Sequence, residues 1–285
     1  MPNKVSIVAL VTSHNNPKLL EALKCLGVSC NLASVDLEIF LANSGEKKVS
    51  GQFPEEIAVT EIITSRDTFW AGGMRAAWEA ADEHKSKFTH VLWLNDDTLV
   101  SHQAISVLLE TLTALGGRAL AIGSCSGADG STSYGGQVSR HPLLPLHLNL
   151  VEPKDDFQFC DSANGNLVLV ELDHFVRLGG FPIGYTHLRA DLAFAFEARK
   201  GGIPVVLAPG TLAHCEPNLN YKSYSDLRCM PLKQRFAALN DPKFGPIVES
   251  IGFSLKYGGP LGMAYALAPL LKVFFGALPS KNRKP

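Results

Sequence analysis

Short apolar runs alternate with polar segments over the first 125 residues. Four of these runs have the length of a strand, and they lie at Val5–Val11, Val35–Ala42, Ile57–Ile63 and Val91–Leu94. The last run has no polar residue, as expected for a strand that is buried on both faces. Apolar residues at helical spacing lie in the intervening and following segments, among them Leu19–Leu26, Ala76–Ala81 and Gln103–Leu115. Strands and helices that alternate four times predict a parallel, doubly wound sheet.

The pattern is less regular after residue 125. We expect a hairpin or loop, two further strands and a helix, at Ser131–Gln137, Asn166–Glu171, Ile203–Leu207 and Leu188–Lys200. The composition changes again after Glu216, where Tyr221–Leu239 is helical in pattern and Ile251–Leu278 is mostly apolar. We therefore expect one domain over residues 1–220, with halves of about 1–125 and 126–220, and a helical C-terminal extension over residues 221–285.

The apolar surface of this extension has three interpretations. The first is an amphipathic segment on a lipid surface, with the basic tail at Lys281–Lys284 toward the headgroups. The second is a helix pair packed on the domain, and the third is a surface between two copies in a homodimer.

Polar residues follow the central apolar run directly. Val91–Leu94 ends on Asn95, Asp96, Asp97 and Thr98. Ligands of α/β sheets bind beyond the carboxyl ends of strands, and carboxylates there are costly to desolvate unless a positive group pairs with them. Mg²⁺ is such a partner, because it takes one or two carboxylates together with substrate oxygens. The alternative is that Asn95 and Asp96 form an Asx turn that caps a helix near Ser101.

Bulk composition narrows the function classes. The net charge is −1 and the sequence pI is about 6.7, so nucleic-acid binding is not expected. The six cysteines form no C-x₂-C pair, which favours buried, reduced thiols in a cytoplasmic protein over a zinc or disulfide framework. We find no signal peptide before Val5–Val11 and no run of eighteen apolar residues, so a membrane-spanning segment is not expected.

Five stretches follow one another in a characteristic order over about residues 4–216. They are Thr12–Asn15 after the first strand, Asn43-Ser44 after the second, Phe69–Ala77 before a helix, Leu94–Thr98, and a last group of Leu178–Phe181, Asp191, Gly202, Val205–Pro209 and His214. In this order they resemble family 2 glycosyltransferases of the GT-A fold, especially bacterial rhamnosyltransferase-like enzymes that build surface polysaccharide. The resemblance implies an α/β GT-A fold with a Rossmann-like, mostly parallel central sheet flanked by helices.

The resemblance also implies roles for single residues. Asp97 matches the metal-binding acid, His214 a histidine that completes the metal or diphosphate site, and Asp191 the catalytic base. The residues at nucleotide-sugar-binding positions are Thr12, Ser13, Asn43, Gly73, Arg75, Asn95 and Asp96, and those of a sugar or acceptor pocket are Trp70 and Asn164. Each assignment has a plainer alternative. Asp191 suits the start of a helix, His214 is then an ordinary core or surface histidine, Trp70 packs in the core and Asn164 forms a turn.

The implied function is inverting, metal-dependent transfer of a sugar from a UDP- or dTDP-sugar to a saccharide or lipid-linked saccharide acceptor, in cell-surface polysaccharide synthesis. A divalent cation, Mn²⁺ or Mg²⁺, shields the leaving diphosphate, and a base takes the acceptor proton. A sugar nucleotidyltransferase is an alternative, although Thr12–Pro17 lacks the Gly, Lys and Arg of a triphosphate loop. A non-catalytic nucleotide-sugar-binding protein is another, because Ala190, Ala193 and Glu197 depart from the family pattern.

Overall fold

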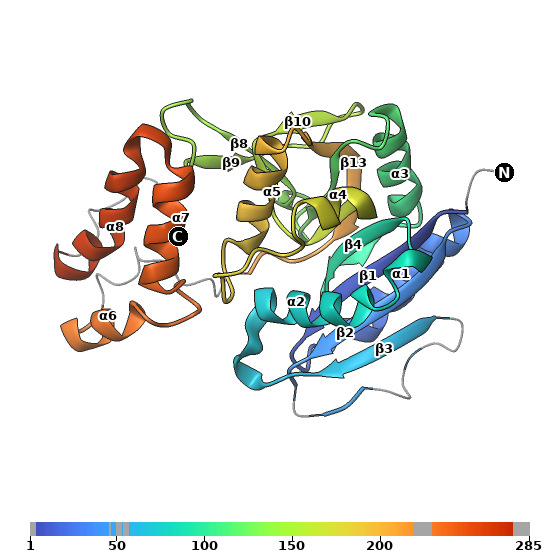
Figure 1. The fold of residues 1–285 in the computed structure, drawn as a ribbon, viewed down its shortest axis with the longest axis horizontal. Coiled ribbons are helices and arrows are strands. Elements are labelled where there is room, and N and C mark those ends of the chain that lie inside the picture. The colour runs from blue at the N-terminus through green and yellow to red at the C-terminus, as the bar shows by residue number, and fades with distance from the viewer. Residues whose placement is uncertain (1–3, 46, 50–52, 54–56, 219–229, 276–285) are drawn as a thin grey trace.

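The protein is an α/β structure in which helices cover both faces of a curled, mixed sheet (Figure 1). The computed structural model describes residues 4–275 except 46, 50–52, 54–56 and 219–229. Ten strands of the described residues form the large sheet: β1 (Ser6–Ser13), β2 (Asp36–Asn43), β3 (Ala58–Ile63), β4 (His90–Asn95), β5 (Leu99–Val100), β6 (Leu120–Ser126), β7 (Thr132–Tyr134), β10 (Gln158–Cys160), β12 (Leu167–Glu171) and β13 (Val205–His214). A small sheet contains β8 (Gly136–Ser139), β9 (Leu148–Leu150) and β11 (Ser162–Ala163).

The direction of the strands corrects the prediction of a parallel sheet. Strands β3, β2, β1 and β4 are adjacent and parallel, as the first 125 residues predicted. Strand β12 then lies antiparallel between β4 and β6, and β6 pairs in parallel with β13. The apolar run at Leu167–Val170 indicated a buried strand, but its direction depends on the long-range pairing of Leu167 with Leu94, which a local pattern does not contain.

The helices form one layer on each face of the sheet. Helices α1 (Leu19–Leu32) and α3 (Ala104–Ala114) pack on one face. On the other face lie α2 (Phe69–Asp82), α4 (Leu172–Arg177) and α5 (Ala190–Lys200). Short 3₁₀ helices η1 (Arg66–Thr68) and η2 (Lys85–Lys87) flank α2.

The uninterrupted apolar run of β4 follows from this two-layer packing. Leu92 and Leu94 point into the core beneath α1 and α3, whereas Val91 and Trp93 point into the opposite core. Trp93 is almost completely buried, and its ring lies 4.6 Å from Phe181 and 4.8 Å from Phe194, measured between ring centroids. The central strand is therefore fixed by apolar packing on both sides, and its polar end is held in a defined place.

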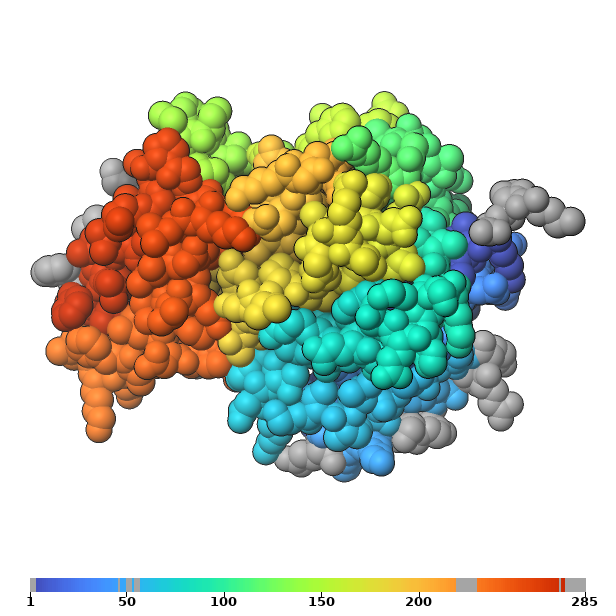
Figure 2. Space-filling model, viewed as in Figure 1, coloured from blue at the N-terminus to red at the C-terminus, as the bar shows by residue number. Residues whose placement is uncertain are grey.

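The C-terminal extension is helical where the structure describes it. It contains α6 (Leu232–Ala238), α7 (Ile247–Tyr257), η4 (Gly259–Leu261) and α8 (Gly262–Phe275), at one end of the molecule (Figures 1 and 2). The helix predicted at Tyr221–Leu239 lies partly outside the described residues, and so does the basic tail. Helix α7 packs on α5, where the Tyr257 hydroxyl donates to Glu197 Oε1 at 2.7 Å. None of the described helices has the length and apolarity needed to cross a bilayer.

Candidate functional site

Loops from both parts of the large sheet meet where β4 ends. Strands β1 to β4 run in parallel, so their carboxyl ends lie at one edge of the sheet. Because β12 is antiparallel to β4, its beginning lies at the same edge, with Leu167 opposite Leu94. The backbone N–H of Asn95 donates to the carbonyl of Asn166 at 3.1 Å. The segment before β12 is thereby joined to the acidic end of β4.

A cavity of about 860 Å³ opens beside this edge, and we call it the first cavity. Five of the predicted site residues line it, namely Thr12, Ser13, Trp70, Gly73 and Asp96. Gly73 allows α2 to approach β1, because a Cβ at this position would lie 2.6 Å from the Thr12 methyl group. The first cavity is thus walled by the loops after β1, β2 and β3 and by the start of α2.

Asp96 projects into this wall as a half-buried carboxylate. Its Oδ1 accepts a hydrogen bond from Asn16 Nδ2 at 2.9 Å. Burial raises the pKa of Asp96 and the neighbouring Asp97 adds to the rise, while the hydrogen bond from Asn16 lowers it. The raised pKa shows that burial of this carboxylate is not fully compensated by the protein groups around it.

The helix-capping alternative for Asn95 and Asp96 is wrong. Asn95 Oδ1 accepts a hydrogen bond from the indole nitrogen of Trp70 at 2.8 Å, and Asp96 is bonded to Asn16. The following helix, α3, begins at Ala104 and has no side-chain cap. Both polar side chains therefore bond to other segments of the chain, Trp70 on α2 and Asn16 in the loop after β1.

The structure places Asp97 and His214 in different surroundings. Asp97 Oδ1 accepts a weak bond from the buried thiol of Cys215 at 3.4 Å. His214 Nε2 lies 3.0 Å from Glu216 Oε1, and side chains alternate along an extended chain, so His214 and Glu216 point away from the side of Cys215. Within the described part of the chain, no three His, Cys, Asp or Glu side chains are grouped to hold a metal. The structure has no direct contact between the side chains of Asp97 and His214 within the described residues, and their joint binding of a metal stays a prediction.

A second cavity, of about 440 Å³, is lined by two further predicted site residues, Asn164 and Asp191. Asp191 Oδ2 accepts the backbone N–H of Gly165 at 3.0 Å, and Oδ1 accepts that of Leu192 at 2.8 Å. Burial raises the pKa of Asp191 against the lowering effect of these bonds. Asn164 Oδ1 accepts a long bond from Gln137 Nε2 at 3.3 Å.

The two cavities approach each other at Gly165. A Cβ at this residue would lie 2.8 Å from the ring of Trp70, which lines the first cavity. The same Cβ would lie 3.2 Å from Cβ of Asp191, which lines the second. The backbone of one glycine therefore fills the space between Trp70 and Asp191.

Two predicted nucleotide contacts have internal partners instead. Arg75 Nη1 donates to the carbonyls of Pro182 at 3.1 Å and Tyr185 at 3.0 Å, so Arg75 holds the loop after α4 rather than lining the first cavity. The buried Asn43 donates from Nδ2 to Glu61 Oε1 at 2.7 Å, and it lines a smaller cavity of about 340 Å³. For both residues, these contacts favour a structural role.

Two residues of the first cavity were not foreseen as site residues. Lys243 comes from the segment between α6 and α7, and His187 from the loop before α5. The His187 ring lies 5.8 Å from that of Phe69, its Nδ1 is buried without a partner among the described residues, and burial lowers its pKa. No sequence pattern could have found them, because they reach the cavity through contacts between segments that are distant in sequence.

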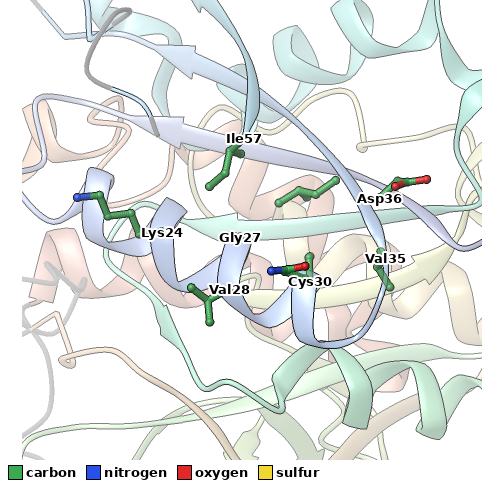
Figure 3. A pocket seen from close by; sticks show the side chains of 9 residues that line it. Lys24, Gly27, Val28, Cys30, Val35, Asp36 and Ile57 are labelled. Carbon is green, nitrogen blue, oxygen red and sulfur yellow. The ribbon is translucent and has the colours of Figure 1, made fainter. Parts of the chain in front are cut away.

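A further cavity, of about 700 Å³, lies between α1 and the beginning of β2 (Figure 3). Its lining includes Gly27, Val28, Cys30, Val35 and Ile57, with Lys24 and Asp36 among the few charged side chains. It holds no predicted site residue and no set of converging polar groups, which ligand sites normally have. The first two cavities remain the candidate site.

Comparison of the chain with models of protein families and with curated proteins finds no match. The chemistry of the site is therefore inferred from its own side chains. The first cavity presents the carboxylates of Asp67 and Asp96, the basic side chains of Arg66 and Lys243, and the indole of Trp70. Asp191 lies in the second cavity, and Asp97, which follows Asp96, lines neither. This set suits a phosphorylated ligand on one side and a hydroxyl group that loses a proton on the other.

Proposed function

We propose that the protein is an inverting glycosyltransferase of the GT-A fold that uses a nucleotide-sugar donor and a divalent cation. The observation that carries this proposal is that two cavities approach each other at Gly165: Trp70 and Asp96 line the first, and Asp191, across Gly165 from Trp70, lines the second. Transfer of a sugar needs a donor site and an acceptor site that meet at one carbon atom. The two cavities supply one site each.

The first cavity suits the donor. Its volume of about 860 Å³ is in the range of cavities that bind small ligands, about 300–1,000 Å³. Arg66 and Lys243 supply two basic side chains that suit a diphosphate, although Asp67 and Asp96 line the same wall. Trp70 offers a ring against which a sugar or base packs. A UDP- or dTDP-sugar is the donor that we propose.

Asp96 and Asp97 fit a divalent cation that arrives with the donor. Hard oxygen ligands suit Mg²⁺ and Mn²⁺, and Mg²⁺ is commonly held by one or two carboxylates together with substrate phosphate oxygens. Neither residue forms an ion pair with a Lys or Arg of the described residues. A bound cation would neutralise charge on the leaving diphosphate.

Asp191 is our candidate for the general base. Its two backbone hydrogen bonds fix the carboxylate, and a pKa raised by burial makes it a better proton acceptor near neutral pH. In a direct displacement the acceptor hydroxyl attacks from the side opposite the leaving group, and Asp191 lies in the second cavity rather than the first. We propose a saccharide or lipid-linked saccharide as the acceptor there.

Binding of a nucleotide sugar without transfer is the second candidate function. One observation favours it: both carboxylate oxygens of Asp191 already accept backbone N–H groups, which suits a residue that stabilises the start of α5. A cytoplasmic location belongs to both proposals. Five cysteines of the described residues carry free thiols, which agrees with a reducing compartment.

A ligand screen tests the proposal. The melting temperature is measured with UDP-, dTDP- and GDP-sugars and their nucleoside diphosphates, each with and without Mn²⁺, because a ligand of the folded state raises it. We expect at least one nucleotide to raise the melting temperature more with Mn²⁺ than without. We expect this difference to vanish in Asp97→Asn and persist in the control Asp82→Asn, a half-buried carboxylate at the end of α2 that lines neither cavity. If no nucleotide has an effect, both candidate functions fail. If a nucleotide sugar binds but no nucleoside diphosphate is released in the presence of any saccharide acceptor, the second function is favoured.

A further inference from the structure

Helices α6 and α8 expose apolar side chains on one surface at the end of the molecule. On α8, Met263, Leu267, Leu271 and Phe274 are 62%, 46%, 54% and 58% exposed. At 3.6 residues per turn these four positions lie within about 100° of the helix circumference. They therefore form one stripe, which points away from the side of α8 that buries Ala266 and Val273.

Helix α6 extends this stripe. The rings of Phe236 and Phe274 meet edge to face with centroids 5.4 Å apart. Leu232 lies one turn before Phe236 and is 54% exposed. Arg235, between them in sequence, ties α6 to α8 through a hydrogen bond of its Nη1 to the carbonyl of Val273 at 3.5 Å. We call the six side chains the outer apolar face: Leu232, Phe236, Met263, Leu267, Leu271 and Phe274.

The charge of the chain is divided unequally between this extension and the rest. Residues 221–285 contain ten Lys and Arg against three Asp and Glu, a net charge of +7. Residues 1–220 contain sixteen against twenty-four, a net charge of −8. The balanced total of −1 hides this division. On α6 itself, Lys233 is exposed beside Leu232 of the outer apolar face.

We propose that the outer apolar face binds the surface of an anionic lipid bilayer, with α6 and α8 lying in the interface. An exposed apolar helix stripe on a strongly basic segment has the properties of an interfacial helix, which gains from burial of apolar side chains and from attraction to anionic headgroups. None of the described helices is long and apolar enough to span a bilayer. This inference does not depend on the transfer reaction.

Charge complementarity selects lipid over a second copy of the chain. A twofold dimer through this face would bring two segments of charge +7 together, and like charges across an interface oppose association. The negative surface of an anionic bilayer attracts the same segment. The acidic remainder of the chain is repelled by that surface, which favours contact through the extension.

Vesicle cosedimentation of the full chain tests the proposal. The vesicles are phosphatidylcholine alone or an equal mixture of phosphatidylcholine and phosphatidylglycerol. The variant Leu267→Asp/Leu271→Asp places two charges one turn apart on the outer apolar face. The control Val28→Asp/Leu32→Asp does the same on α1, where both side chains are exposed to a similar degree, 44% and 62%. Circular dichroism and melting temperature verify that both variants fold.

We expect the wild type to bind the mixed vesicles at least tenfold more tightly than phosphatidylcholine vesicles, and to lose this preference in high salt. The variant on the outer apolar face should bind at least tenfold less, and the control within twofold of wild type. Absence of binding to mixed vesicles overturns the proposal, as does equal binding by a folded Leu267→Asp/Leu271→Asp variant. A lipid-free dimer that this variant dissociates also overturns it, because a second copy then covers the face.

Discussion

Strand β4 carries a titratable side chain at each end, His90 at its beginning and Asp96 just beyond its last residue. At the beginning, Nδ1 of His90 lies 2.8 Å from the Thr89 hydroxyl, and Thr89 bonds in both directions to the backbone of Ser6. These polar groups form hydrogen bonds with one another, and His90 lines none of the cavities described above. At the other end, four segments converge on Asn95, Asp96 and Asp97 beside a cavity.

The comparison separates burial from function. Burial shifts the pKa of both residues, downward to about 4 for His90 and upward for Asp96. A perturbed pKa therefore does not identify a site by itself. What distinguishes the carboxyl end is that its polar groups come from distant segments and face space that a ligand can fill.

The largest expected effect is on catalysis. Asp191→Asn removes the proposed base, and we expect turnover to fall by about 10³-fold with unchanged donor affinity, since general bases contribute about 10²–10⁴-fold. The matched control is Asp173→Asn, because Asp173 is also the second residue of its helix, α4, and is exposed. Steady-state kinetics of nucleoside diphosphate release give both numbers. Equal turnover in the two variants would assign Asp191 to helix stabilisation.

The contact between the two cavities is tested by Gly165→Ala. The added methyl group would press on Trp70 and Asp191, and overpacking of this kind costs about 2 kcal/mol of unfolding free energy. We expect turnover to fall as well, because both neighbours move. The control Gly252→Ala lies in α7 with open space around its Cβ, so chemical denaturation should show no loss of stability there. A fully active Gly165→Ala variant would separate the two cavities functionally.

The beginning of β4 should affect stability but not turnover. The pKa of His90 is lowered in the folded state to about 4 from 6.5, so the unfolded chain takes up the proton first. Stability is complete above pH 6.5 and falls as the pH decreases toward 4, by about 1.5 kcal/mol for this residue after allowance for its partial exposure. In urea titrations at pH 7 and pH 4.5, His90→Asn should lose less unfolding free energy at the lower pH than the wild type does. Its turnover should equal that of the wild type. An unchanged acid dependence would assign the loss to other groups.

The smallest effect is expected for Trp70→Phe. This change keeps an aromatic ring but leaves Asn95 Oδ1 without its indole donor, which costs about 1 kcal/mol of unfolding free energy. Donor affinity should also fall, because the ring lines the first cavity. In the control Trp78→Phe, the ring packs on Phe175 and makes no hydrogen bond to the described residues, so donor affinity should not change. Equal donor affinity in both variants would remove Trp70 from the donor site.

Much of the fold was predictable where the pattern is local. The strands around Val8, Ile39 and Leu92 were recognised because burial on both faces leaves an apolar run, and the residues after them had to lie at one edge. The position of β12 between β4 and β6 was not predictable, since it depends on pairing between residues more than 70 positions apart, such as Leu167 and Leu94.

The site shows the same division between local and distant information. Thr12, Trp70 and Asp96 line the first cavity. The sequence motifs named all three as ligand-binding positions, and that role stays a prediction. The bonds of Arg75 to Pro182 and Tyr185 were not foreseen, nor was the contribution of Lys243. Each of these depends on a contact between loops, for which periodicity carries no signal.

The central claim is that the carboxylates that follow β4 act together with Asp191, across Gly165, in one reaction. Single-turnover release of nucleoside diphosphate is measured for the wild type, Asp97→Asn, Asp191→Asn and the double variant, with Mn²⁺ and a donor found in the ligand screen. We predict that each single variant loses at least about 100-fold, and that the double variant loses clearly less than the product of the two losses, as for residues that act as a unit. Wild-type turnover in either single variant, or a double loss equal to that product, would contradict the claim.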